Sequence, residues 1–82
     1  MEPIQNVSGE WLQNGDPNRP CAIFQVGRMM LVVNEKGSLA TAVAVGPSTL
    51  QIMQGSGWQP GLAADLQDDR TLVWRGGGFW QR

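Results

Sequence analysis

The chain has 82 residues, of which 41% are hydrophobic and only 16% charged, and its formal net charge is −1. A chain of this length forms one domain with a small core, so we expect residues 1–82 to be a single domain. The composition excludes a highly charged disordered tail. Six basic residues scattered singly in a slightly acidic chain predict no nucleic-acid partner.

Apolar stretches in this sequence are short. The longest, Met29–Val33, is far below the ~20 residues that span a bilayer, which predicts no membrane partner. The N-terminus has neither a basic region nor an apolar run of the kind found in signal peptides. We therefore expect a cytoplasmic protein, and a processed form of a secreted protein stays open. The lone Cys21 predicts no intramolecular disulfide.

Short segments rich in β-branched and aromatic residues follow one another along the chain, separated by Gly, Pro, Asn and Asp. The predicted strands are Val7–Gln13, Cys21–Val26, Met29–Asn34, Ser38–Val45, Thr49–Met53, Thr71–Trp74 and Phe79–Arg82. The segment Leu62–Leu66 is ambiguous between a further strand and one helical turn.

Two of the connections carry clear turn chemistry. Gly27-Arg28 is typical of a two-residue type II′ hairpin turn. The segment from Asn34 to Gly37 is typical of a type I turn that closes with glycine in the left-handed region.

The segment Ser38–Val45 alternates with a period of two. Leu39, Thr41, Val43 and Val45 fall on one face, and Ala40, Ala42 and Ala44 on the other. This pattern predicts a strand with one face of larger residues and one face that another part of the structure approaches closely.

The strands start about every ten residues, which favours an all-β fold with antiparallel up-and-down topology. Because the sequence has few charges to protect open strand edges, we expect seven or eight short strands in a closed or nearly closed small barrel. Strands this short favour an interior filled by side chains.

The sequence contains few of the residue types that enzymes use for catalysis. The chain has no His and no Tyr, so its serines lack a base for a catalytic triad, and Cys21 lacks a partner that would activate it. Metal sites of the Cys/His type are excluded, and the glycines form no phosphate-binding motif. We expect no enzyme activity, no catalytic residue, no bound metal and no cofactor.

Four Trp residues in 82 are the strongest enrichment. In a small barrel, Trp at strand ends can simply plug the openings. The functional alternative is an aromatic surface for a ligand, and Trp58, Trp74 and Trp80 are the candidate ligand-binding residues. Trp58 is the strongest because it lies in the Gly/Pro-bounded loop 55–61.

Gly9-Glu10-Trp11 opens the first predicted strand, and Arg82 closes the last. This combination resembles the calycin-type barrels (lipocalins, fatty-acid-binding proteins and avidins). The resemblance implies that Arg82 stacks across Trp11 and closes one end of the barrel, a structural role, and it implies a ligand-binding cavity.

Two functions follow as hypotheses. The first is a small non-catalytic binding module whose ligand is an apolar small molecule, a sugar or a peptide contacted by Trp residues. The alternative is a structural or assembly protein that acts as a homo-oligomer and binds no small molecule, with Met29, Met30 and Met53 as an adaptable contact surface or as core.

Overall fold

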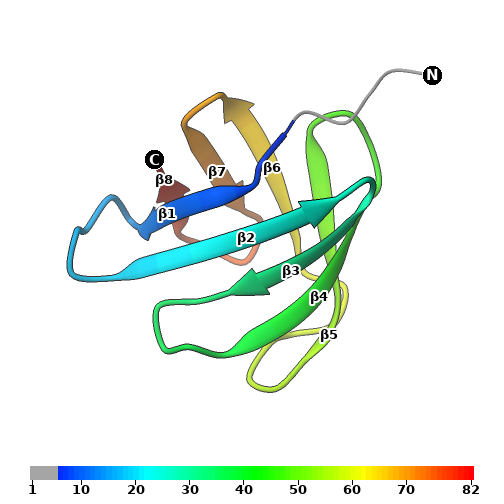
Figure 1. The fold of residues 1–82 in the computed structure, drawn as a ribbon, viewed down its shortest axis with the longest axis horizontal. Coiled ribbons are helices and arrows are strands. Elements are labelled where there is room, and N and C mark those ends of the chain that lie inside the picture. The colour runs from blue at the N-terminus through cyan, green and yellow to red at the C-terminus, as the bar shows by residue number, and fades with distance from the viewer. Residues whose placement is uncertain (1–5) are drawn as a thin grey trace.

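The computed structural model describes residues 6–82, which form eight β-strands and no helix. The strands are β1 (Gly9–Gln13), β2 (Pro20–Val26), β3 (Met29–Val33), β4 (Leu39–Ala44), β5 (Thr49–Gly55), β6 (Ala63–Asp68), β7 (Thr71–Trp74) and β8 (Phe79–Gln81). Figure 1 shows them following one another around a barrel, with β8 beside β1.

Every strand pairs antiparallel with the next in the sequence, and the last pairs with the first. That closing contact aligns Leu12 with Gln81 and Gln13 with Trp80. The predicted all-β up-and-down barrel is therefore confirmed, with eight strands and full closure. Closure gives each strand a partner on both sides, which removes the exposed edges that a weakly charged sheet would otherwise present.

Buried and exposed side chains alternate along the strands, and the buried ones fill the interior of the barrel. In β4 the three alanines are buried, whereas Leu39 on the opposite face is 49% exposed. These small alanines share the core with much larger buried side chains such as Trp11 and Trp80. The core is formed by Val7, Trp11, Cys21, Ile23, Met30, Val32, Ala40, Ala42, Ala44, Leu50, Ile52, Ala64, Leu66, Leu72, Trp74 and Trp80.

The space left near Leu50, Leu66 and Leu72 measures about 10 Å³. That is at or below what a single water molecule needs, so this part of the interior has no room for a ligand.

Both predicted turns are present. Gly27 has φ 61° and Arg28 has no positive φ, which fits type II′. Gly37 has φ 79°, and its N–H donates to the Asn34 carbonyl oxygen at 2.9 Å. These two turns set the register of β2 with β3 and of β3 with β4.

The structure corrects some element bounds. The first strand begins at Gly9 instead of Val7, because the Val7 N–H donates to the side chain of Gln25 on β2 rather than to a backbone carbonyl of that strand. The ambiguous segment near residue 64 is strand β6, held between β5 and β7. Strand β5 continues past Met53 to Gly55, through a bulge opposite Thr41 and Ala42.

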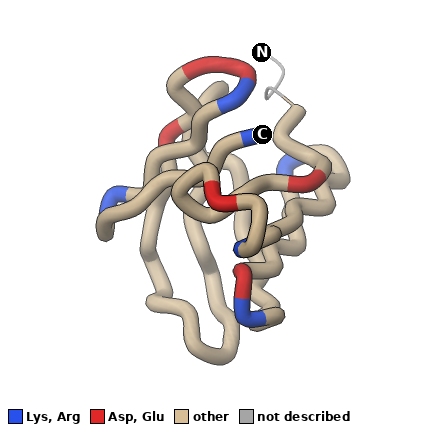
Figure 2. The backbone as a smooth tube through the Cα atoms, turned by 90° about the vertical axis from the view of Figure 1, so that its left-hand side faces the viewer, with Lys and Arg blue, Asp and Glu red and all other residues tan. Residues whose placement is uncertain are grey.

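Charged side chains are unevenly distributed. Figure 2 shows most of them in the connections between strands and at the end of the chain. The four strands β2–β5 contain no Asp, Glu, Lys or Arg. The described part of the chain holds no helix long and apolar enough to cross a membrane.

Candidate functional site

In an up-and-down barrel, alternate connections lie at the same end. The connections after β1, β3, β5 and β7 (residues 14–19, 34–38, 56–62 and 75–78) therefore share one end, which we call the Trp end. The connections after β2, β4 and β6 lie at the opposite end together with Arg82, and we call it the Arg82 end. Three of the connections of the Trp end (34–38, 56–62 and 75–78) contribute residues to the candidate site.

Three Trp residues from three separate elements meet at the Trp end. Trp58 comes from the β5–β6 connection, Trp74 ends β7 and Trp80 lies in β8. Their ring centroids are 5.4 Å (Trp58–Trp74), 6.2 Å (Trp58–Trp80) and 5.2 Å (Trp74–Trp80) apart, with tilted or edge-on rings. These distances are those of directly packed aromatic rings, so the three form one cluster.

The members of the cluster differ in exposure. Trp74 and Trp80 are 5% and 1% exposed and belong to the core, whereas Trp58 is only partly buried and packs against it. Trp58 therefore forms the outer layer of the cluster. A ligand that approached from solvent would meet its ring first.

Hydrogen bonds fix two of these indoles. The Trp58 Nε1–H donates to the Ser38 carbonyl oxygen at 3.0 Å, which anchors the β5–β6 connection to the start of β4. The Trp80 Nε1–H donates to Gln13 Oε1 at 2.6 Å. The Trp74 Nε1–H is buried without a hydrogen-bond partner, the one such side-chain atom among residues 6–82.

A hollow of about 290 Å³ lies against this cluster. Its apolar lining residues are the three Trp residues and Leu62. Its polar lining residues are Gln13, Asn34, Glu35 and Gln59, and Gly57 and Gly77 complete it. No Lys or Arg lines it. The site thus combines an aromatic floor with amide and carboxylate groups.

Hydrogen bonds inside the protein orient two of these amides. Gln13 Oε1 accepts from Trp80, so its amide nitrogen is left to donate. Asn34 Oδ1 accepts from the backbone N–H groups of Lys36 and Ser38, which leaves its amide nitrogen to donate as well. Glu35 can only accept when it is ionised. The rim therefore offers both donors and an acceptor.

The Arg82 end is held by a different contact. The Arg82 guanidinium carbon lies 4.5 Å from the centroid of the Trp11 ring. Arg82 also donates to the carbonyl oxygens of Asp69, Ser8 and Asn6. It thereby joins the end of β8 to the β6–β7 turn and to the segment before β1.

Cys21 lies in the core, and burial, together with the nearby Glu35 charge, raises the pKa of its thiol to about 11. It is therefore a neutral thiol near pH 7. Among the described residues, no group of three or more His, Cys, Asp or Glu side chains is placed to hold a metal ion.

On the outer wall, Asp65 accepts hydrogen bonds from Arg75 and Thr49, and these lower the pKa of its carboxyl. Thr49 and Asp65 lie on β5 and β6, and Arg75 follows β7 in the connection to β8; none of the three lines the hollow.

The structure brings Trp58, Trp74 and Trp80 together, and it brings Trp11 together with Arg82. Sequence reasoning did not find the polar rim (Gln13, Asn34, Glu35 and Gln59), because these residues lie at the end of β1 and in two connections far apart in the sequence. The available signal was the topology, since the first, third and fifth connections of such a barrel share one end.

Comparison of the chain with models of protein families, with curated proteins and with solved structures found no match. The structure shows a small closed barrel of eight antiparallel strands with a Trp cluster at one end.

Proposed function

We propose that this protein is a non-catalytic binding module and that the hollow at the Trp end takes one sugar unit of a carbohydrate. The observation that carries the proposal is the Trp58 ring, layered on Trp74 and Trp80 and bordered by amides and a carboxylate. A sugar ring has an apolar face of C–H groups and an equator of hydroxyls. The hollow offers a complement to both.

The aromatic floor supports the first half of this match. Trp58 packs on two buried rings and is tied to Ser38, so its ring is held in place before a ligand arrives. Stacking on a fixed aromatic ring requires little ordering of the protein, which favours affinity.

The polar rim supports the second half. Hydroxyl groups donate and accept, and the rim supplies the Gln13 and Asn34 amide nitrogens as donors and Glu35 as an acceptor. The absence of Lys and Arg from the lining argues against an anionic ligand. A purely apolar ligand would leave these amides and the carboxylate without partners, which is unfavourable.

The size of the hollow also fits. At about 290 Å³ it lies just below the ~300–1,000 Å³ range of small-molecule sites, which suits a ligand as small as one sugar unit. The resemblance to calycin-type barrels would place a ligand inside the barrel, but the core side chains fill that space, which favours the hollow at the end.

The non-catalytic part of the proposal rests on the groups present. Glu35 is the one carboxylate that lines the hollow, and the buried Cys21 thiol is neutral near pH 7. Acid–base cleavage of a glycosidic bond needs a pair of carboxyl groups that face each other across the substrate.

The experiment is a titration of uniformly ¹⁵N-labelled protein with a panel of neutral mono- and oligosaccharides, followed through the four indole N–H signals. We expect the Trp58 signal to shift and the Trp11 signal, from the opposite end, to stay. Trp58→Ala and Gln59→Ala should each weaken binding about ten-fold, whereas Gln67→Ala, the same change on exposed β6, should leave it unchanged. If no sugar moves the Trp58 signal, the proposal is wrong.

A further inference from the structure

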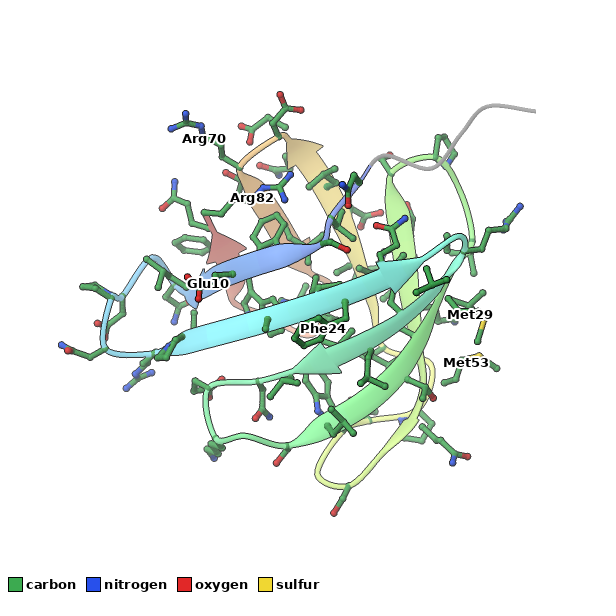
Figure 3. The ribbon with its side chains drawn as sticks, viewed as in Figure 1. Glu10, Phe24, Met29, Met53, Arg70 and Arg82 are labelled. Atoms are coloured by element: carbon green, nitrogen blue, oxygen red, sulfur yellow. The ribbon has the colours of Figure 1, made fainter. Side chains whose placement is uncertain are left out.

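The outer wall of the barrel over β2–β5 carries a large apolar surface, which we call the apolar face. Six exposed side chains define it: Phe24, Val26, Met29, Leu31, Leu39 and Met53. Figure 3 shows Phe24, Met29 and Met53 on these strands with their side chains outside the core.

Strand register makes this surface continuous. Phe24 is paired with Leu31, and Leu31 with Thr41 on β4. A second row runs from Val26 through Met29 to Val43, and a third joins Val33 to Leu39. Met53 lies in the β5 bulge beside Thr41. Side chains that are aligned across neighbouring strands on one face of a sheet contact each other, so these rows form a single patch.

The chemistry of the apolar face differs from that of the opposite wall. No charged residue occurs anywhere in β2–β5, whereas the wall over β6 and β7 carries Asp65 and its partner Arg75. Depletion of charge in the centre of a patch, with Phe and Met enriched, is the composition of a protein–protein interface core. A surface adapted only to solvent would have mixed charges on both walls.

The area of the apolar face is at the lower limit for one side of a dimer contact. Its six residues are between 38% and 82% exposed, which amounts to about 600 Å² of accessible surface, the upper end of the range for the largest apolar patch of a monomer. Two copies packed through this face would remove about 1,200 Å² from water, which reaches the range of specific interfaces.

We infer that the apolar face is the contact of a symmetric homodimer, in which each copy covers this face of the other. A two-fold contact places the same patch on both sides, and a charge-free patch meets itself without repulsion. The net charge of −1 opposes association very little. The small core of an 82-residue chain gains stability from the additional burial. No residue of the apolar face lines the hollow at the Trp end, so this inference does not depend on the proposed ligand.

The test measures molar mass by light scattering and sedimentation equilibrium, under reducing conditions, from about 1 µM to about 500 µM protein. We expect the mass to rise from 8.9 kDa towards twice that value. Leu31→Lys places a charge in the middle of the apolar face and should weaken dimerisation about 30-fold or more. The matched control is Val73→Lys, the same charge on β7 of the opposite wall beside Asp65, which should leave the dimer intact.

Circular dichroism reports whether each variant is folded. Should Leu31→Lys fail to fold, Thr41→Lys, which replaces a polar residue in the same row, takes its place. A wild-type chain that stays at 8.9 kDa throughout the concentration range overturns the inference. The inference is also overturned if a folded Leu31→Lys or Thr41→Lys variant still dimerises. It is overturned as well if the apolar face becomes covered only when phosphatidylcholine vesicles are present.

Discussion

Arg82 stacks on Trp11 with 4.5 Å between its guanidinium carbon and the ring centroid, and so joins the last residue of the chain to the first strand. The ring beneath it is buried, and its Nε1–H donates to the Val7 carbonyl oxygen at 2.9 Å. Three segments far apart in the sequence are held by this one arrangement, because Arg82 also reaches the β6–β7 turn.

Loss of the Arg82–Trp11 contact should lower the free energy of unfolding by a measurable amount. Arg82→Ala removes the cation–π contact and the hydrogen bonds to backbone carbonyls, and we expect a loss of about 1–2 kcal/mol in the free energy of unfolding. Arg82→Lys keeps the charge but not the planar donor group, so its free energy of unfolding should lie between those of the wild type and Arg82→Ala. Urea unfolding measures the free energy of unfolding of each variant. Arg70→Ala, in an exposed turn, is the control and should change stability by less than about 0.5 kcal/mol; an equal loss there would contradict the prediction.

A second prediction concerns the close approach of β4 and β5. A methyl group added at Gly55 would lie 2.5 Å from Ala40 Cβ and 2.6 Å from the Leu39 carbonyl oxygen, so the backbone would have to move. Gly55→Ala should therefore destabilise the barrel by about 1–3 kcal/mol. Gly46→Ala is the matched control, since its nearest contact is Thr49 Cβ at 4.0 Å. Thermal unfolding of the two variants should separate them, and similar melting temperatures would refute the prediction.

The Cys21 thiol makes stability depend on alkaline pH. Its pKa is about 11 in the folded protein against an ordinary value of 9.0, because burial disfavours the thiolate. The folded state binds this proton more tightly than the unfolded state does. The contribution is therefore fully present below pH 9 and is lost as the pH rises towards 11, about 2–3 kcal/mol in all.

Urea unfolding at intervals between pH 8 and pH 11 measures this dependence. Because other groups titrate in the same range, the quantity to compare is the difference between the wild type and Cys21→Val. The free energy of unfolding of the wild type should fall relative to that of Cys21→Val as the pH rises from 9 towards 11. If the two stability curves stay parallel, the Cys21 thiol is not the cause of the pH dependence.

The fourth prediction concerns the unpartnered indole. Three Trp residues donate Nε1–H to an acceptor, whereas the Trp74 Nε1–H is buried with none. An N–H without an acceptor is less deshielded, so its proton should resonate upfield of the other three in a ¹H–¹⁵N spectrum. Assignment by single Trp→Phe variants identifies each signal. A Trp74 signal among the downfield ones would indicate an acceptor at this site.

The strands could be predicted from the sequence because their signals are local. Alternation in residues 39–45 separates the alanines from the larger side chains, and glycine marks the two hairpin turns. Leu62–Leu66 was ambiguous because Leu and Ala also favour helices. Pairing with β5 and β7, which is a non-local effect, makes it a strand.

The candidate site was only partly predictable. Its aromatic residues stand out by their number, but their exposure depends on packing, which places Trp74 and Trp80 in the core and Trp58 above them. The polar rim has no local signature, because Gln13, Glu35 and Gln59 meet only when the barrel closes. Of the three methionines that the sequence offered as contact surface or core, Met29 and Met53 are exposed and Met30 is buried. The strand register then adds the exposed neighbours that complete the apolar face, which no local pattern indicates.

The hydrogen bonds from Arg82 to the carbonyl oxygens of Ser8 and Asn6 place the last residue next to the segment that leads into β1. A linker or a surface attachment at either place therefore extends from the end of the barrel opposite the hollow. Immobilising the protein through residue 82 for a binding assay should leave all four connections of the Trp end accessible.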